Sequence, residues 1–198
     1  MSSHYIIRDE QSPGLLILDP DAVEGTVIPS LLEWAPTVMI TQKAINYVHR
    51  KNFKIDALYL YEVSPEHVED LMEYQRPYEI YLTEEKSVVH DTRDFLDAQG
   101  VTELNIIGCI SSGLCKEVCE HLDDIETTIY CKNAKYFHVK SGHFSKWTVP
   151  GHGFFVNQDI TVKTEGLNKI DSFHFKSARE GRIQINSDRD FWLGEIIL

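Results

Sequence analysis

The sequence lacks any apolar run long enough to cross a membrane as a helix. Such a span takes roughly 18 to 20 consecutive apolar residues, and no stretch of this chain approaches that length. The first residues, MSSHYIIRDEQSPG, also lack the basic start and apolar centre of a signal peptide. A cytoplasmic location is therefore expected, and no membrane partner is expected.

Basic residues are scarce relative to acidic ones. The chain of 198 residues has 19 Lys and Arg against 31 Asp and Glu, which gives a formal net charge of -12. A phosphate backbone is bound by concentrated positive charge, and no basic stripe is present to supply it. Nucleic acid is therefore not an expected partner.

The motifs of several common enzyme classes are also missing. Neither GxGxxG nor GxxxxGK[ST] follows any expected strand, which argues against a Rossmann cofactor site and a Walker-type phosphate site. No GxSxG elbow supports a Ser-His-Asp hydrolase. Cys115, Cys119 and His121 lie close in sequence, but the paired CxxC spacing of a structural zinc site is absent. We interpret the two cysteines as buried thiols on a helix and predict no metal site there.

The composition is typical of a globular protein, with 42% hydrophobic residues. In the first part of the chain, apolar segments of strand length alternate with segments of helical periodicity. The expected strands are 14–19, 37–41, 57–61, 78–83, 103–108 and 126–131, and the expected helices are 28–35, 42–51, a helix capped by Ser64, 86–99 and 112–122. This order predicts an α/β lobe over residues 1–132, with an open, mostly parallel sheet.

Helical periodicity ends after Lys132. Short alternating segments follow at 136–139, 154–156, 160–162, 173–175, 183–185 and 191–197, separated by glycine-containing turns such as Glu180-Gly181. This pattern predicts an all-β sandwich lobe over residues 133–198. Trp147 falls in this lobe, and we expect a core or interface aromatic rather than the wall of a cleft.

Candidate chemistry lies in the stretch from Thr37 to Ser64. Ligands of open parallel sheets bind beyond the carboxyl ends of the strands, and two expected strands end here, at Thr41 and at Tyr61. Phosphoryl transfer at such a place requires carboxylates that hold magnesium. The candidate acids are Asp19, Asp56 and Glu62, although Asp19 and Asp56 are equally suited to turns. Ser111-Ser112 follows another strand and is interpreted first as a helix cap.

The order of these segments resembles that of the thiamine pyrophosphokinase family. Three stretches also resemble motifs of the family. ITQKAINYVHRKNFKIDALYLYEVS is similar to the family's DGGANxLxxxxIxPDxxIGDxDS, and the residues on matching or nearly matching positions are Ala44, Asn46, Asp56 and Ser64. LNIIGCISSGL is similar to IxIxGxxGGRxDH, where Gly108 agrees. Val162 with Gly166-Leu167 resembles the VxxxGL hairpin of the family's second lobe.

The resemblance implies an α/β lobe followed by a β-sandwich lobe, a homodimer, and transfer of a diphosphate from ATP to thiamine with magnesium. It identifies no catalytic residue. The residues it places near a ligand or a metal are Gln42, Asp56, Glu62, Ser64, Ser111 and Ser112.

The departures from the family pattern fall on its acids. Thr41-Gln42-Lys43 stands where the family has Asp-Gly-Gly, and Tyr61 and Val63 replace the two aspartates of GDxDS. Ser87-Val88 replaces a later Thr-Asp pair, and Gly113 to Lys116 replaces RxDH. Tyrosine and valine do not serve as magnesium ligands.

Three hypotheses follow from these departures. The first is a kinase with weak or altered activity, in which Asp56, Glu62, Glu84 and Glu85 compensate for the lost acids with magnesium and ATP as cofactors. The second is a non-catalytic homodimer on the same scaffold that binds a small, thiamine-like molecule or a partner protein and uses no cofactor. The third is an unrelated two-lobe binding module.

Overall fold

The computed structural model describes residues 12–157 and 160–197. The chain divides into two compact units, Met1–Lys132 and Asn133–Leu198. Within the described residues, no helix is long and apolar enough to cross a membrane.

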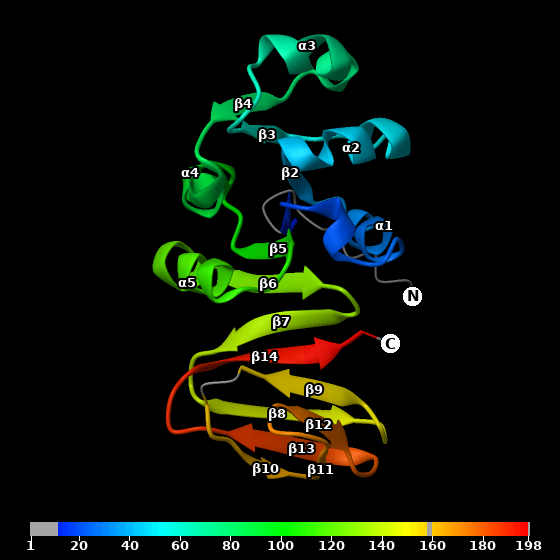
Figure 1. Ribbon diagram of the computed structural model, residues 1–198, viewed down its shortest axis with the longest axis vertical. Helices are drawn as coiled ribbons and strands as arrows, with labels where there is room; N and C mark the ends of the chain where they lie inside the picture. The colour runs from blue at the N-terminus through cyan, green and yellow to red at the C-terminus, as the bar shows by residue number, and fades with distance from the viewer. Residues whose placement is uncertain (1–11, 158–159, 198) are drawn as a thin grey trace, which may run out of the picture. The chain divides into compact units, whose positions relative to one another are not determined.

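The first unit is built on a parallel sheet (Figure 1). Its strands, in spatial order, are β6 (Glu126–Cys131), β5 (Glu103–Ile107), β1 (Gly14–Ile17), β2 (Thr37–Thr41), β3 (Ala57–Leu60) and β4 (Glu79–Leu82). The chain moves outward from β1 through β2 and β3 to β4, and then returns to the other side of β1 as β5. The order of strands therefore reverses between β1 and β5, which is the topological switch point of the sheet.

Helices cover both faces of this sheet. They are α1 (Val27–Leu32), α2 (Ile45–Lys51), α3 (Glu66–Met72), α4 (Val88–Gln99) and α5 (Ser112–His121), with short 3-10 turns at Pro20–Ala22, Gln42–Ala44, Glu73–Gln75 and Glu85–Ser87. Figure 1 shows α1 and α2 on one face and α4 and α5 on the other. All residues of β1 and β3 are buried, because apolar side chains on both faces of the sheet are covered.

The core on the α1–α3 side combines alternate residues of the strands, such as Leu15, Val38 and Leu58, with Val48 of α2 and Met72 of α3. On the opposite face α4 packs close to the centre of the sheet. A Cβ added at Gly14 would lie 3.0 Å from Leu96 of α4 and 2.9 Å from Leu104. Only a glycine allows this approach without moving those side chains.

The second unit is a β-sandwich. One sheet has the order β11 (Leu167–Lys169), β12 (His174–Ser177), β9 (Gly153–Val156), β14 (Phe191–Ile196) and β7 (Ala134–Val139). The other has the order β10 (Lys163–Glu165), β13 (Gly181–Asn186) and β8 (His143–Thr148). Phe154, Phe175 and Leu193 from the first sheet meet Ile183 and Ile185 from the second in a shared core. The predicted fold class, an α/β lobe followed by an all-β sandwich, is confirmed.

Several local predictions are wrong. Residues 160–162 form no strand, since β10 begins at Lys163, and the strands β8 and β11 were not anticipated. Ser64 does not cap α3, which begins at Glu66 with Pro65 before it; the Ser64 hydroxyl contacts the side chains of Glu66 and His67 instead. Trp147 is 68% exposed, which excludes the expected core position, while the expected interface position stays a prediction.

A buried carboxylate links the two sheets of the sandwich. Glu195 of β14 is 4% exposed, accepts a hydrogen bond from Lys146 of β8, and lies 2.8 Å from Nε2 of His152. Lys135 is 3.6 Å away. Burial by itself would raise the pKa of Glu195, but Lys146, Lys135 and His152 together hold that pKa below its ordinary value.

Replacing this carboxylate should destabilise the sandwich. We expect Glu195→Gln to lower the free energy of unfolding by about 3 kcal/mol, because it leaves a partly buried ammonium without its partner. Since the pKa of Glu195 is lowered in the folded state, its contribution is present at neutral pH. It is lost as the pH falls below the ordinary carboxyl value, about 4.3, and through the lowered folded-state value. Urea unfolding between pH 7 and pH 3 measures both effects.

The matched control is Glu165→Gln, an exposed acid on β10, which should change the free energy of unfolding by no more than about 0.5 kcal/mol. Equal stability losses in the two variants at pH 7 would show that Glu195 does not hold the sheets together.

Candidate functional site

The candidate site is a cavity of about 210 Å³ at the edge of the first unit's sheet where the carboxyl ends of the strands meet. We call it the carboxyl-edge cavity. It is lined by residues that follow four of the parallel strands and by residues at the start of two helices. These are Leu18, Asp19, Thr41, Lys43, Tyr61, Glu85, Val88, Gly108, Cys109 and Leu114. The cavity thus includes the switch point between β1 and β5, where ligands of open α/β sheets bind.

Backbone and side-chain hydrogen bonds hold the strand ends around the cavity. The N–H groups of Leu18 and Asp19 both donate to the carbonyl of Ile107, at 2.9 and 3.2 Å. The Thr41 hydroxyl donates to the carbonyl of Leu18 at 2.8 Å. Gly108 lies against Leu18, and a Cβ at Gly108 would come within 3.2 Å of the Leu18 side chain. These contacts join the ends of β1, β2 and β5.

Gln42 joins the ends of β2 and β3. Its side-chain oxygen accepts from the backbone N–H groups of Tyr61 and Glu62, each at 3.1 Å, and its amide nitrogen lies 3.5 Å from Oε2 of Glu62. The amide therefore satisfies two backbone donors of the loop that follows β3. In the family pattern this position is a glycine, which could not form this link.

Two of the residues that line the cavity form an ion pair. Nζ of Lys43 lies 2.6 Å from Oε1 of Glu85, and both side chains are about half exposed. The hydrogen bond that Lys43 donates to Glu85 is the main reason that the pKa of Lys43 is raised, with further contributions from Tyr61 and Asp19. Burial raises the pKa of Tyr61, although Lys43 opposes this effect. At neutral pH the site therefore offers one ammonium group, two carboxylates and a neutral phenol.

The acids near the cavity already have partners. Asp19 caps the turn Pro20–Ala22, since its Oδ1 accepts from the N–H of Asp21 at 2.9 Å. Glu85 pairs with Lys43, and Glu84 beside it pairs with Lys86 at 2.9 Å. Across residues 12–157 and 160–197, no three His, Cys, Asp or Glu side chains form a group that could hold a metal ion.

Asp56 lies away from this site. It precedes β3, whereas Glu62 follows it, and its Oδ2 accepts from the N–H of Val38 at 2.7 Å. The four residues of β3 separate the two acids by more than about 10 Å, at roughly 3.3 Å per residue. Carboxylates that share a magnesium ion each place an oxygen about 2.1 Å from it. Asp56 and Glu62 are therefore not brought together as ligands of one ion.

The remaining predicted residues lie near the carboxyl ends of the strands but do not line the cavity. Ser111 is the N-cap of α5, where its Oγ accepts from the N–H of Leu114 at 3.1 Å, and Ser112 is exposed at the first position of that helix. Ser64 lies in the loop before α3. Four residues that line the cavity were not among the predicted site residues. Each is the last residue of a strand or lies within two residues after one, and this position was the signal for them. They are Thr41, Lys43, Tyr61 and Cys109.

The two thiols on α5 that suggested a metal at first sight are half-buried and unoxidised. Burial raises the pKa of Cys115 to about 12. A thiol held protonated in this way is a poor metal ligand, because the thiolate is the form that binds.

These features define a doubly wound α/β unit with a cavity at its switch point, followed in the chain by a β-sandwich unit. Solved thiamine pyrophosphokinases have this fold. The enzyme from Bacillus subtilis aligns with a TM-score of 0.67 and 7% identity, over 93% of this chain and 99% of its own. The Candida albicans enzyme gives 0.63 and 12% over 96% and 90%, and the yeast enzyme 0.64 and 11% over 97% and 88%.

The resemblance seen in the sequence is thus confirmed at the level of the fold. No protein-family model matches the sequence, and no curated protein matches it either.

The role of Gln42 can be tested by removing its amide. We expect Gln42→Ala to lower the free energy of unfolding by about 1–2 kcal/mol, because two backbone N–H groups lose their acceptor. Hydrogen exchange at the amides of Tyr61 and Glu62 should become at least about tenfold faster. Gln99→Ala is the control, since the Gln99 side chain is exposed. Unchanged exchange at Tyr61 and Glu62 would mean that Gln42 does not hold this loop.

Proposed function

We propose that the protein binds a small polar molecule in the carboxyl-edge cavity and does not transfer diphosphate. The observation that carries the proposal is that the acids beside the cavity are engaged with protein groups. Asp19 caps a turn, Glu85 pairs with Lys43, and Glu62 lies beside the Gln42 amide. Among the described residues, no three His, Cys, Asp or Glu side chains form a group that could hold a metal ion.

Magnesium-bound ATP does not fit these residues. Diphosphate transfer depends on metal ions and cationic groups that neutralise charge developing on the phosphates. The one ammonium group of the cavity, Lys43, is already paired with Glu85. The first N–H groups of α5 could face a phosphate, but the Ser111 side chain already binds one of them. We therefore derive no catalytic step through ATP.

The size and charge of the cavity favour a small ligand with both polar and apolar parts. Its volume, about 210 Å³, is below the roughly 300 Å³ at which pockets for drug-sized ligands begin. It therefore suits a smaller molecule or one ring of a larger one. The charged residues that line the cavity are Asp19, Glu85 and Lys43, so the lining has one more acidic than basic side chain and favours a cationic group, and Val88 and Leu114 offer apolar contacts. Thiamine is the first candidate, because the structural neighbours are named for their action on it.

Calorimetric titration tests the proposal. We expect heat of binding with thiamine in the absence of magnesium and ATP, and no heat with magnesium-ATP at millimolar concentration. Glu85→Gln should weaken thiamine binding about fivefold, which corresponds to the roughly 1 kcal/mol of an exposed charge interaction. Glu84→Gln is the matched control, because Glu84 is the adjacent residue, is also exposed and also pairs with a lysine.

Three results would contradict the proposal. Binding of magnesium-ATP would favour the alternative, a kinase with altered activity. Equal weakening by Glu84→Gln and Glu85→Gln, or no heat with thiamine, would show that thiamine does not bind in this cavity.

We also propose a homodimer, which rests on the family resemblance. Sedimentation equilibrium should give a mass twice the 22.8 kDa of the chain at micromolar concentration. A single species of 22.8 kDa at concentrations up to 100-fold higher would rule out this assembly.

A further inference from the structure

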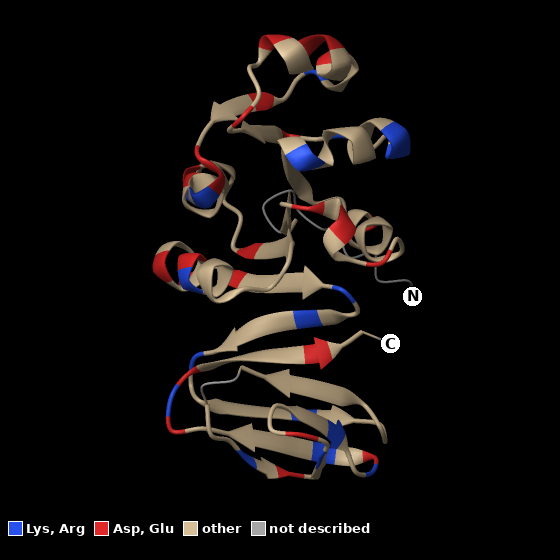
Figure 2. Ribbon diagram, viewed as in Figure 1, with Lys and Arg blue, Asp and Glu red and all other residues tan. Residues whose placement is uncertain are grey.

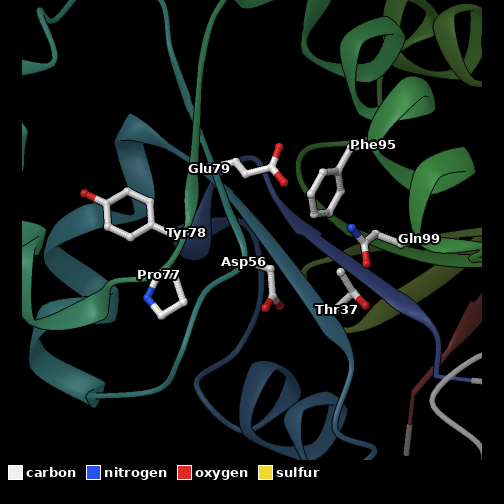
Figure 3. Close-up of a pocket in the computed structure, with 7 residues that line it drawn as sticks. All are labelled: Thr37, Asp56, Pro77, Tyr78, Glu79, Phe95 and Gln99. Carbon is white, nitrogen blue, oxygen red and sulfur yellow. The ribbon is translucent and has the colours of Figure 1, made fainter.

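A second cavity lies at the opposite edge of the first unit's sheet. It has a volume of about 280 Å³ and is lined by residues from the starts of β2, β3 and β4 and from the last turns of α4. These residues are Thr37, Asp56, Pro77, Tyr78, Glu79, Phe95 and Gln99 (Figure 3). We call it the amino-edge cavity. It shares no lining residue with the carboxyl-edge cavity.

The electrostatic potential in the amino-edge cavity is negative. Asp56 and Glu79 are its charged lining residues, and neither is in an ion pair with any described residue. Each uses one carboxylate oxygen within the protein: Asp56 accepts from the N–H of Val38, and Glu79 accepts from the hydroxyl of Tyr81. The second oxygen of each remains for another donor. Figure 2 also shows acidic residues on α3, β4 and α4.

The helix α4 adds to this potential. Its 12 residues end at Gln99, beside the cavity, with Gly100 as the C-cap. The carbonyl end of a helix has a partial negative charge that favours a cation within the last turn. Two carboxylates and a helix C-terminus therefore act in the same direction.

The cavity also has an apolar wall and unused hydrogen-bonding groups. Phe95, which is 4% exposed, lies one turn before Gln99 on the same face of α4. Figure 3 shows the Phe95 ring and the Gln99 amide on one side of the hollow, with Glu79 and Asp56 across from them. Within the described residues, the side chains of Thr37 and Gln99 form no hydrogen bond to the protein. An aromatic ring beside carboxylates suits an organic ammonium ion, which binds to both.

We propose that the amino-edge cavity binds a small organic ammonium ion, such as a short aliphatic diamine. Its ammonium groups would donate to Asp56 and Glu79, and its carbon chain would lie against Phe95. A metal ion is less suited, because hard cations such as calcium take six or more oxygen ligands and only two carboxylates are present. This site is independent of the proposed function, since it concerns other residues at the other edge of the sheet.

The probe is 1,4-diaminobutane, and 1,4-butanediol is its uncharged counterpart of the same length. Both are titrated into the full-length protein at low salt and followed by amide chemical shifts. We expect the diamine to shift the amides of Thr37, Glu79 and Gln99 with saturation in the millimolar range. The diol should cause no saturable shift at tenfold higher concentration.

Two variants with the same loss of charge locate the binding. Glu79→Gln should weaken diamine binding at least about fivefold. Glu103→Gln removes an exposed acid at the start of β5, outside the cavity, and should weaken it less than twofold. Phe95→Leu keeps an apolar side chain at a buried position but removes the ring; binding should weaken about threefold, as expected for loss of a cation–π contact.

The inference is overturned if the diol binds as well as the diamine, or if magnesium chloride at equal ionic strength produces the same saturable shifts. It is also overturned if Glu79→Gln and Glu103→Gln have equal effects, since the diamine would then respond only to net charge. Circular dichroism of each variant establishes that it is folded, so that a loss of binding can be assigned to the site.

Discussion

The parallel pairing of β1 with both β2 and β5 is the constraint on which the rest of the first unit depends. Ile17 of β1 is opposite Ile40 on one side and Ile107 on the other. The chain leaves β1 in one direction and returns to it from the other, so the connections at the carboxyl ends diverge and leave a hollow between them. Hydrogen bonds from Leu18, Asp19 and Thr41 fix the strand ends around that hollow. The topology thus places a hollow at this point of the sheet.

The side chains at the cavity determine which ligands it can bind. Here several of them form contacts that hold the surrounding loops together. Where the family pattern has two glycines, this chain has Gln42 and Lys43, which bridge neighbouring loops. An amide that holds two backbone N–H groups and an ammonium paired with Glu85 stabilise the strand ends, but they leave few charges to neutralise a diphosphate. The fold of the solved thiamine pyrophosphokinases is therefore present, and the proposed function assigns binding without diphosphate transfer to the residues at its cavity.

Much of the fold could be predicted from the sequence, because local signals agreed with it. The strand Thr37–Thr41 was predicted with its observed bounds, and the helix that ends at Gln99 was anticipated from its apolar spacing and from Gly100. The start of α3 was misplaced, since Ser64-Pro65-Glu66 resembles a cap that the backbone does not use. The short strands β10 and β11 have only three residues each, too few for alternation to identify them.

The site was harder to predict, because its contacts join residues that are distant in sequence. Lys43 and Glu85 are 42 residues apart, and nothing local to either indicates the pair. Asp56 matched a family position yet holds the N–H of Val38 at the other edge of the sheet. The buried Glu195 could not be recognised either, since its partners Lys135, Lys146 and His152 come from three other segments. Charge pairing across a fold depends on three-dimensional proximity that strand and helix periodicity do not specify.

Phosphorus-31 NMR of the protein with ATP, magnesium and thiamine tests the central claim most directly, because diphosphate transfer would convert ATP into AMP and thiamine diphosphate. The account predicts that, over many hours, the three ATP resonances lose intensity no faster than in a control without protein. Growth of AMP and thiamine diphosphate signals in proportion to protein concentration would contradict it.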